Sequence, residues 1–239
     1  MVEEQKLTVL EHLEDLRKRL MRVAIFVVAG TAVSFIFAED IIDTLKSVSD
    51  DVTLQAIDPT ETIVTYFKLA FNCGLAIAIP AIIFEAVMYV RPALTSREKT
   101  YFYTLLPCVV LAFAGGVVFA YFVLLPPAID FLFNFGSDVA AVEWRISRYI
   151  TLITRLLFAI GLCFELPIVI FFLAKIGIVS VQKLKRFRRW AIVLAFVASA
   201  FITPTPDPVN QCIVAVPLII LYELGILLAW IAQRGKPNE

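Results

Sequence analysis

Residues 150–174 read ITLITRLLFAIGLCFELPIVIFFLA, and Arg155 and Glu165 are the only charged residues in this run. An α-helix rises 1.5 Å per residue, so roughly 20 such residues cross the ~30 Å of hydrocarbon in a bilayer. The run is therefore long enough to span a membrane. The whole chain agrees: of 239 residues 60% are hydrophobic and 18% charged, with a mean hydropathy of +0.87. These values exclude a water-soluble globular domain.

Five more segments resemble this one, and together they predict an all-α polytopic membrane protein with six transmembrane helices. The fifth span is short, because it has only 13 residues, from Trp190 to Ile202, before the sequence TPTP breaks the helix. Such a span covers only about 20 Å, so it requires either a locally thinned bilayer or shielding by neighbouring helices. As an alternative, the sixth span is short as well. We expect one membrane domain, residues 1–239, with spans at roughly 20–38, 69–90, 101–127, 150–174, 190–203 and 210–232.

Lysine and arginine are distributed unequally between the two ends of these spans. Sixteen of the 21 lie at the N-terminus, in the second and fourth connections and in the C-terminal tail. Cytoplasmic loops carry the excess of basic residues, so both termini are expected in the cytoplasm. The outer connections 39–68 and 128–149 are long enough to form caps, whereas 204–209 is a Pro-rich turn.

Several classes of function have no support in the sequence. The net charge is zero, which gives no reason to expect a nucleic-acid partner. Four separated cysteines and one histidine make a metal centre or other cofactor unexpected. Nucleophile elbows, zinc-protease motifs and phosphate-binding loops are absent, so we do not expect an enzyme. The first apolar run has no small-residue cleavage site and is interpreted as a retained span.

Charged residues at the cytoplasmic ends of two predicted spans are candidates for ion pairing or for binding a ligand. Residues 7–20 place leucines at three- and four-residue spacing, which predicts an amphipathic helix that runs into the first span. On its polar face, Glu14 can pair with Lys18 and Asp15 with Arg19, four residues apart. Glu98 falls in the first turn of the third span, where a carboxylate is favourable. Two carboxylates at this rim would also suit a ligand with two guanidinium groups.

Three acidic residues lie inside the predicted spans: Glu85, Glu165 and Glu223. A carboxylate in hydrocarbon must be protonated, paired or turned toward a polar cavity or partner. Glu165 precedes Pro167, which frees a backbone carbonyl one turn back and adds polarity. A functional role is the first expectation for Glu165, whereas Glu85 and Glu223 lie closer to span ends and either serve function or reach the interface.

In their order along the chain, several stretches resemble the TatC family, the multi-spanning core subunit of the twin-arginine protein translocase. The resemblance covers nearly the whole chain, and the ordered set is more specific than any single motif. The stretches are HLEDLRKRL at 12–20, RPAL at 91–94 with Glu98, FAYF at 119–122, FELP at 164–167, and Thr203, Pro204, Asp207, Gln211 and Pro217.

The resemblance implies a function and a set of partners. The protein would be a non-enzymatic receptor for the twin-arginine signal peptides of folded cargo proteins. It would lie in a bacterial or archaeal cytoplasmic membrane and form the core of an exporter driven by the proton-motive force. Small single-span subunits of the TatA/TatB type would be its partners, with further copies of itself in the complex.

The resemblance also implies roles for individual residues. Signal-peptide contacts map to Asp15, Arg17 and Glu98, with Tyr89 and Pro92 supporting the loop. The family usually has Glu where this chain has Asp15, and Glu14 lies beside it, so either acid could meet the cargo. Relatives often have Gln where this chain has Glu85. Contacts with partner spans map to Asp207 and Gln211, and the buried acid of the concave face maps to Glu165.

Two other functions remain as alternatives. A proton-coupled small-solute transporter could use Glu85, Glu165 and Glu223 as a relay, although the chain shows no internal repeat of the kind many transporters have. A purely structural scaffold for other membrane subunits is the second alternative.

Overall fold

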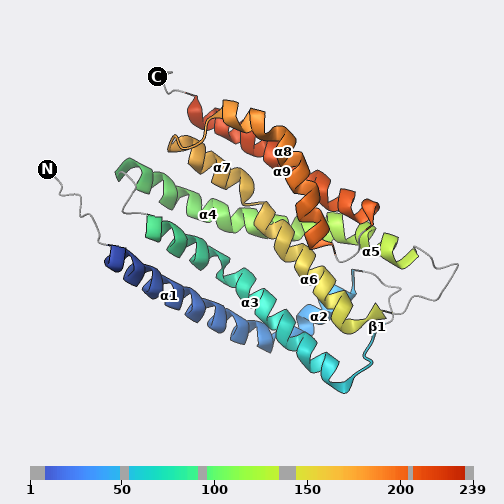
Figure 1. The fold of residues 1–239 in the computed structure, drawn as a ribbon. Helices are drawn as coiled ribbons and strands as arrows, with labels where there is room; N and C mark the ends of the chain where they lie inside the picture. The colour runs from blue at the N-terminus through green and yellow to red at the C-terminus, as the bar shows by residue number, and fades with distance from the viewer. Residues whose placement is uncertain (1–8, 49–53, 91–95, 135–143, 204–206, 235–239) are drawn as a thin grey trace.

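Long helices make up most of the chain, and they run between two ends of one bundle (Figure 1). The computed structural model describes residues 9–48, 54–90, 96–134, 144–203 and 207–234, with side chains except at 9, 87, 90 and 96–105. The elements are α1 (Val9–Ile36), α2 (Ala38–Lys46), β1 (Leu54–Gln55), α3 (Pro59–Val90), α4 (Ser96–Phe119), the π-helix η2 (Ala120–Leu124), α5 (Leu125–Asn134), β2 (Trp144–Arg145), α6 (Ile146–Cys163), α7 (Leu166–Lys175), α8 (Val181–Ile202) and α9 (Pro208–Gln233).

Five helical stretches of the described chain are long and apolar enough to cross a membrane. They are Leu10–Ile36, Pro59–Ala86, Leu106–Asn134, Ile146–Lys175 and Pro208–Gln233. The prediction of an all-α membrane protein is confirmed, and five of its six spans are found by this measure. α8, which contains the fifth predicted span, is not among them, because its first turns are basic and only Trp190–Ile202 is free of charged residues. The alternative that the last span is short is wrong, since α9 has 26 residues.

The long helices alternate in direction, so that the start of one helix lies near the end of another (Figure 1). The start of α1, the end of α3, the start of α4 and the end of α9 lie at one end of the bundle (Figure 1). α2, β1 and β2 lie at the opposite end. We call these the N-terminal end and the cap end. The N-terminal end is the one that the basic connections predict to face the cytoplasm.

The cap end joins two connections that are far apart in sequence. β1 and β2 pair in parallel, with Leu54 opposite Trp144 and Gln55 opposite Arg145. The predicted outer connection 39–68 is therefore partly regular: it contains α2 and β1, and its last ten residues belong to α3. Asp58 precedes α3 and accepts hydrogen bonds from the backbone N–H and hydroxyl of Thr60, which hold the pKa of the Asp58 carboxyl below its usual value.

Glu61 fastens this cap. Its carboxylate is buried and accepts hydrogen bonds from the backbone N–H of Ile57 (3.1 Å), the backbone N–H of Ser147 (3.4 Å) and the guanidinium of Arg145 (3.3 Å). Charge-assisted hydrogen bonds of this kind offset the cost of burying a carboxylate. One side chain at the start of α3 thus connects both predicted caps.

The fourth predicted span is a broken helix. α6 ends at Cys163 and α7 begins at Leu166, with Phe164 and Glu165 in the turn between them. Pro167 stands in the first turn of α7, where a missing backbone N–H costs least. The break therefore coincides with the Glu-Leu-Pro sequence, as the frequency of proline at helix starts would suggest.

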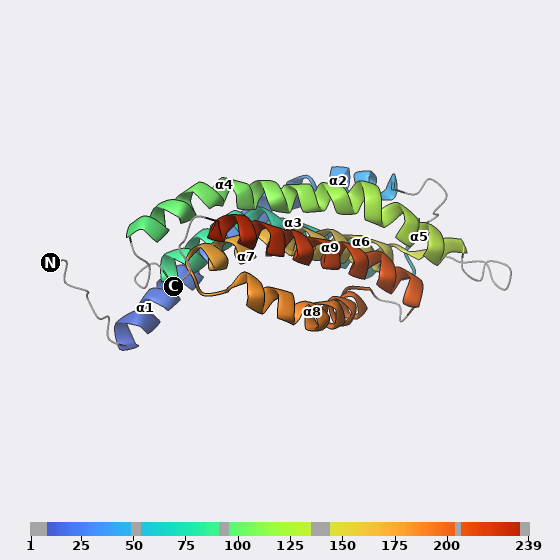
Figure 2. The same ribbon diagram turned by 90° about the horizontal axis from the view of Figure 1, so that it is seen from above.

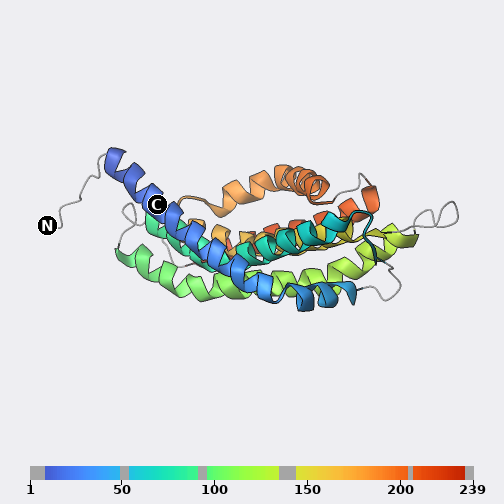
Figure 3. The same ribbon diagram turned by 90° about the horizontal axis from the view of Figure 1, so that it is seen from below.

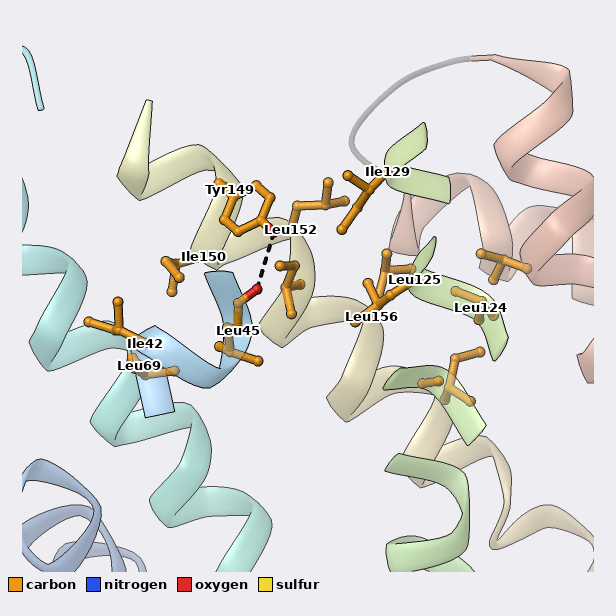
Figure 4. Packing of buried hydrophobic residues seen from close by; sticks show 14 of the residues in the cluster. Ile42, Leu45, Leu69, Leu124, Leu125, Ile129, Tyr149, Ile150, Leu152 and Leu156 are labelled. Atoms are coloured by element: carbon orange, nitrogen blue, oxygen red, sulfur yellow. Dashed lines mark hydrogen bonds between the residues drawn. The ribbon is translucent and has the colours of Figure 1, made fainter. Parts of the chain in front are cut away.

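The main apolar core lies between the cap end and the middle of the bundle. Figure 4 shows Ile42 and Leu45 of α2 near Leu69 of α3, with Tyr149, Ile150 and Leu156 of α6 between them and Leu124 and Leu125. The Tyr149 hydroxyl donates a hydrogen bond to the Leu45 carbonyl (3.1 Å), so the one polar atom of this buried ring is satisfied. α2 is thereby held against the spans.

α1 packs mainly on α3, at a place where the two backbones come close. A Cβ atom added to Gly30 would lie 2.8 Å from the carbonyl oxygen of Gly74, and one added to Gly74 would overlap the backbone of Thr31. Helices in lipid associate by close van der Waals packing rather than by the hydrophobic effect, and small residues permit it. Neither glycine can gain a side chain without moving a helix.

Gly74→Ala should therefore lower the free energy of unfolding in detergent by about 1–3 kcal/mol, the usual cost of overpacking. Size-exclusion chromatography of purified protein that has been heated to increasing temperatures measures the change in thermal unfolding. Gly115→Ala is the matched control, because a Cβ there has no described atom within 4 Å. Equal melting of the two variants would contradict the close approach.

Candidate functional site

Asp15 and Glu14 lie on α1 at the N-terminal end of the bundle, and each is paired one turn along the helix. Glu14 pairs with Lys18 (2.9 Å), and both side chains are more than 60% exposed. Asp15 accepts a hydrogen bond from Nε of Arg19 (2.7 Å) and is only 30% exposed. Both pairs are those that the four-residue spacing predicts. The first is a weak surface pair, whereas the second begins a larger network.

Glu85 is the centre of that network. It lies near the end of α3 with its side chain 6% exposed, and it binds two guanidinium groups from α1. Arg19 Nη1 donates to one carboxylate oxygen (3.0 Å) and Arg22 Nη1 to the other (2.5 Å). Since Arg19 also donates to Asp15, two acids and two bases form one group without net charge. Such mutual pairing offsets the free-energy cost of removing a carboxylate from water.

A ring contact joins the same two helices closer to their ends. His12 of α1 stacks on Tyr89 of α3, with ring centroids 4.3 Å apart and an angle of 22° between the planes. Offset stacking of this kind contributes about 0.5–1.5 kcal/mol beyond the area it buries. Tyr89 therefore lies beside the turn of α1 that precedes Glu14 and Asp15.

The structure describes the other residues predicted for this end only in part. Arg17 is exposed on α1. Glu98 is the third residue of α4, and the start of α4 lies at the same end of the bundle as the start of α1 (Figure 1). The Glu98 side chain and Pro92 lie outside the described part. The helix containing Glu98 thus starts at the same end of the bundle as the helix that contains Glu14 and Asp15 (Figure 1).

Glu165 differs from every other buried acid described here. It is 4% exposed, and neither carboxylate oxygen has a hydrogen-bond partner among the described residues. Its place between α6 and α7, next to Pro167, is the polar position that the sequence predicts. A buried polar group without a partner is rare and calls for an explanation outside the chain or in bound water.

The other three predicted polar residues make contacts within the chain. Asp207 caps α9 by accepting a hydrogen bond from the backbone N–H of Asn210 (2.6 Å). Gln211 donates to the carbonyl of Phe196 (2.9 Å), which links α9 to α8. Glu223 pairs with Arg188 of α8 (2.6 Å), and both side chains are nearly half exposed. Asp207 therefore stabilises the start of α9, whereas Gln211 and Glu223 connect α9 with α8.

Groups that could hold a metal are missing from the residues the structure describes: no three histidine, cysteine or acidic side chains come together there. What the N-terminal end offers instead is carboxylate beside an aromatic ring. Carboxylates bind cations, and guanidinium is the cation that fits a carboxylate in a bidentate manner.

Comparison with known proteins identifies the chain. A family model described as Sec-independent protein translocase protein (TatC) matches residues 11–217. The TatC protein of Carboxydothermus hydrogenoformans is 33% identical over 100% of this chain and 98% of its own length. That of Aquifex aeolicus is 37% identical over 95% of this chain and 96% of its own. The chain belongs to the TatC family.

Solved structures support the same assignment for this TatC chain. Two crystal structures described as the twin arginine translocase receptor TatC match it at 36% identity, with TM-scores of 0.83 and 0.84. The first covers 94% of this chain and 100% of the solved chain. The protein is therefore a multi-pass membrane component of a Sec-independent protein translocase and not an enzyme, as the sequence predicts. The transporter alternative also loses its relay, because Glu85 and Glu223 are both ion-paired.

Reasoning from the sequence of this TatC chain missed three residues of the site. Arg19 and Arg22 were not connected with Glu85, and His12 was not connected with Tyr89. A signal existed for the first pair: a buried acid needs a cation, and Arg19 and Arg22 stand on one helix face at the same end as Glu85. The stacking of His12 has no comparable signal.

Glu85→Gln should destabilise the protein by about 3 kcal/mol, because removing one partner of a buried ion pair leaves the other without compensation. Thermal or denaturant unfolding in detergent measures the change. Glu223→Gln removes a half-exposed pair and should cost about 0–1 kcal/mol.

The double variant Glu85→Gln/Arg22→Gln tests the charge balance directly. It restores a neutral group of Asp15 with Arg19, so it should recover part of the loss. A double variant that is destabilised by the sum of both single changes would contradict the network.

Proposed function

We propose that the protein is the receptor for twin-arginine signal peptides in a cytoplasmic membrane and the core of an exporter for folded proteins. Both termini face the cytoplasm, so the N-terminal end of the bundle meets incoming cargo. The gathering of Asp15, Tyr89 and the start of α4 at this end is the observation that carries the proposal. The likeness to solved structures described as a twin arginine translocase receptor supports it.

Asp15 can accept a cargo guanidinium by exchange. Its carboxylate is partly exposed and already bound to Arg19, so a cargo arginine competes with a group of the same chemistry. Arg19 keeps its second partner, Glu85, when it leaves Asp15. No buried charge is then left without a partner, and the exchange avoids the cost that breaking a buried ion pair usually has.

The second cargo arginine is assigned to Glu98, and Tyr89 and Pro92 shape the loop between the two acids. Glu14 is the alternative to Asp15, since its surface pair with Lys18 is weak and easily replaced. Arg17 is exposed beside them, where it orients the peptide backbone. Each guanidinium–carboxylate pair contributes about 1–3 kcal/mol when partly desolvated.

Partner subunits of the TatA/TatB type are assigned to the other polar positions. Glu165 has no described hydrogen-bond partner and would take one from a partner span, since polar groups in lipid seek counterparts. Asp207 caps the start of α9 and Gln211 links it to α8, and both would present that edge to a partner. Further copies of the chain join the complex, and the proton-motive force drives transport.

Asp15→Ala, Glu14→Ala and Glu98→Ala, made singly, should separate these roles. Replacement of an acid that contacts cargo lowers the crosslinking yield of a peptide with two arginines by about tenfold or more, the effect of losing one charged hydrogen-bonded pair. Glu39→Ala, an exposed acid at the cap end, is the matched control. Undiminished crosslinking in all three variants would remove the proposed site.

A peptide with two lysines in place of the two arginines should bind the unaltered protein weakly, because an ammonium group lacks the planar fork that matches carboxylate. Co-purification of the isolated protein with each precursor measures the preference. Equal retention of both precursors would contradict recognition by paired carboxylates.

A further inference from the structure

An open groove follows the first half of α8, at the N-terminal end of the bundle. It has a volume of about 660 Å³ and is lined by Lys183, Arg186, Phe187, Arg189, Trp190 and Val193. Pockets that take drug-sized ligands have about 300–1,000 Å³. Figures 2 and 3 show that α8 stands at the edge of the bundle, beside α9. The groove is therefore accessible from outside the bundle.

The groove combines positive charge with aromatic rings. Three of its six lining residues are cationic and none is acidic. Arg188, which lies on the same helix but does not line the groove, is paired with Glu223. None of the ion pairs between described residues involves Lys183, Arg186 or Arg189. These cations are available to an anionic ligand.

The same side of α8 changes in polarity along its length. Phe187 lies between the cations Arg186 and Arg189, and Trp190 follows them; the two rings are 45% and 64% exposed. Val193, Val197 and Phe201 continue the face at spacings of three and four residues, and all are exposed. The face thus begins with cations and aromatic rings together and ends with apolar side chains alone. Membrane proteins show this order from the headgroup region through the interface into hydrocarbon.

We propose that this groove is a binding site for an anionic phospholipid. Its phosphate group lies among Lys183, Arg186 and Arg189, its glycerol region lies beside Trp190, and an acyl chain follows the apolar side of α8. An acidic soluble peptide would match the cations but not the exposed apolar residues that continue from them. An amphiphile with a phosphate at one end matches both parts.

A phospholipid bound at this site would compensate for the short apolar part of α8. The 13 residues from Trp190 to Ile202 reach only about 20 Å, well short of the ~30 Å hydrocarbon core. A phospholipid drawn toward the cations at the start of α8 lets the leaflet follow the short helix. The bound lipid then fills the hydrophobic mismatch that would otherwise exist beside α8.

The first test uses the purified full chain in detergent and native mass spectrometry. Phosphatidylglycerol and phosphatidylcholine with the same acyl chains are added separately, and lipid adducts are counted. The unaltered protein should prefer phosphatidylglycerol by about tenfold or more, since each basic residue near a phosphate contributes substantially to attraction. The triple variant Lys183→Gln/Arg186→Gln/Arg189→Gln should lose this preference, and its signal-peptide crosslinking should not change.

A matched control carries the same loss of charge at the same end of the bundle. Lys175→Gln/Lys185→Gln/Arg234→Gln removes three described cations that do not line the groove, and it should keep the preference. Equal binding of the two lipids by the unaltered protein, or an equal loss in both triple variants, would overturn the proposal.

A second measurement needs no change in the groove. With Trp144 and Trp230 replaced by Phe, Trp190 becomes the single tryptophan, and phosphatidylglycerol with brominated acyl chains should quench it more than the brominated phosphatidylcholine does. Equal quenching would overturn the proposal. Retention of a co-expressed membrane protein by the groove in lipid-free detergent, together with equal lipid binding, would assign the surface to a partner helix instead.

Discussion

A carboxylate buried at the end of α3 determines how α1 is placed. Glu85 is almost without access to solvent, and ionised groups in such surroundings need opposite charges close by. α1 supplies two, Arg19 and Arg22, which stand one turn apart on the same helix face. This requirement fixes the rotation of α1 about its axis and its height along α3. Asp15 is turned partly outward as a result, and the ring of His12 comes to rest on Tyr89.

α3 has a comparable arrangement at its other end. Glu61 is buried there and takes its hydrogen bonds from Arg145 and from backbone N–H groups on both sides of the cap. Between these two acids, Gly74 lets the backbone of α1 approach closely. In lipid, where burial of apolar area gives little driving force, such specific contacts decide which helices become neighbours. α3 thus contributes a buried acid to both the N-terminal end and the cap end of the bundle.

How far the sequence alone can predict this arrangement depends on the kind of interaction. Hydropathy locates the long spans, because a bilayer imposes a minimum apolar length. It places the start of α3 ten residues late, since Glu61 and Lys68 look like loop residues until the cap neutralises the acid. Hydropathy also does not establish whether α8 spans the membrane, because the first half of this helix is basic and the second half is apolar. Local ion pairs such as Glu14 with Lys18 follow from spacing, whereas the pairing of Glu85 with Arg19 joins residues 66 positions apart. Contacts of that range depend on helix rotation, which a single sequence does not contain.

The stacked pair of His12 and Tyr89 makes this corner of the protein accessible to spectroscopy. The chain has one histidine, so every imidazole resonance in a magnetic-resonance spectrum of the unmodified protein comes from this position. A ring held 4.3 Å above a phenol experiences its ring current, and the chemical shift changes as soon as the two planes separate. The native sequence therefore contains its own reporter of whether α1 and α3 stay together at their exposed ends.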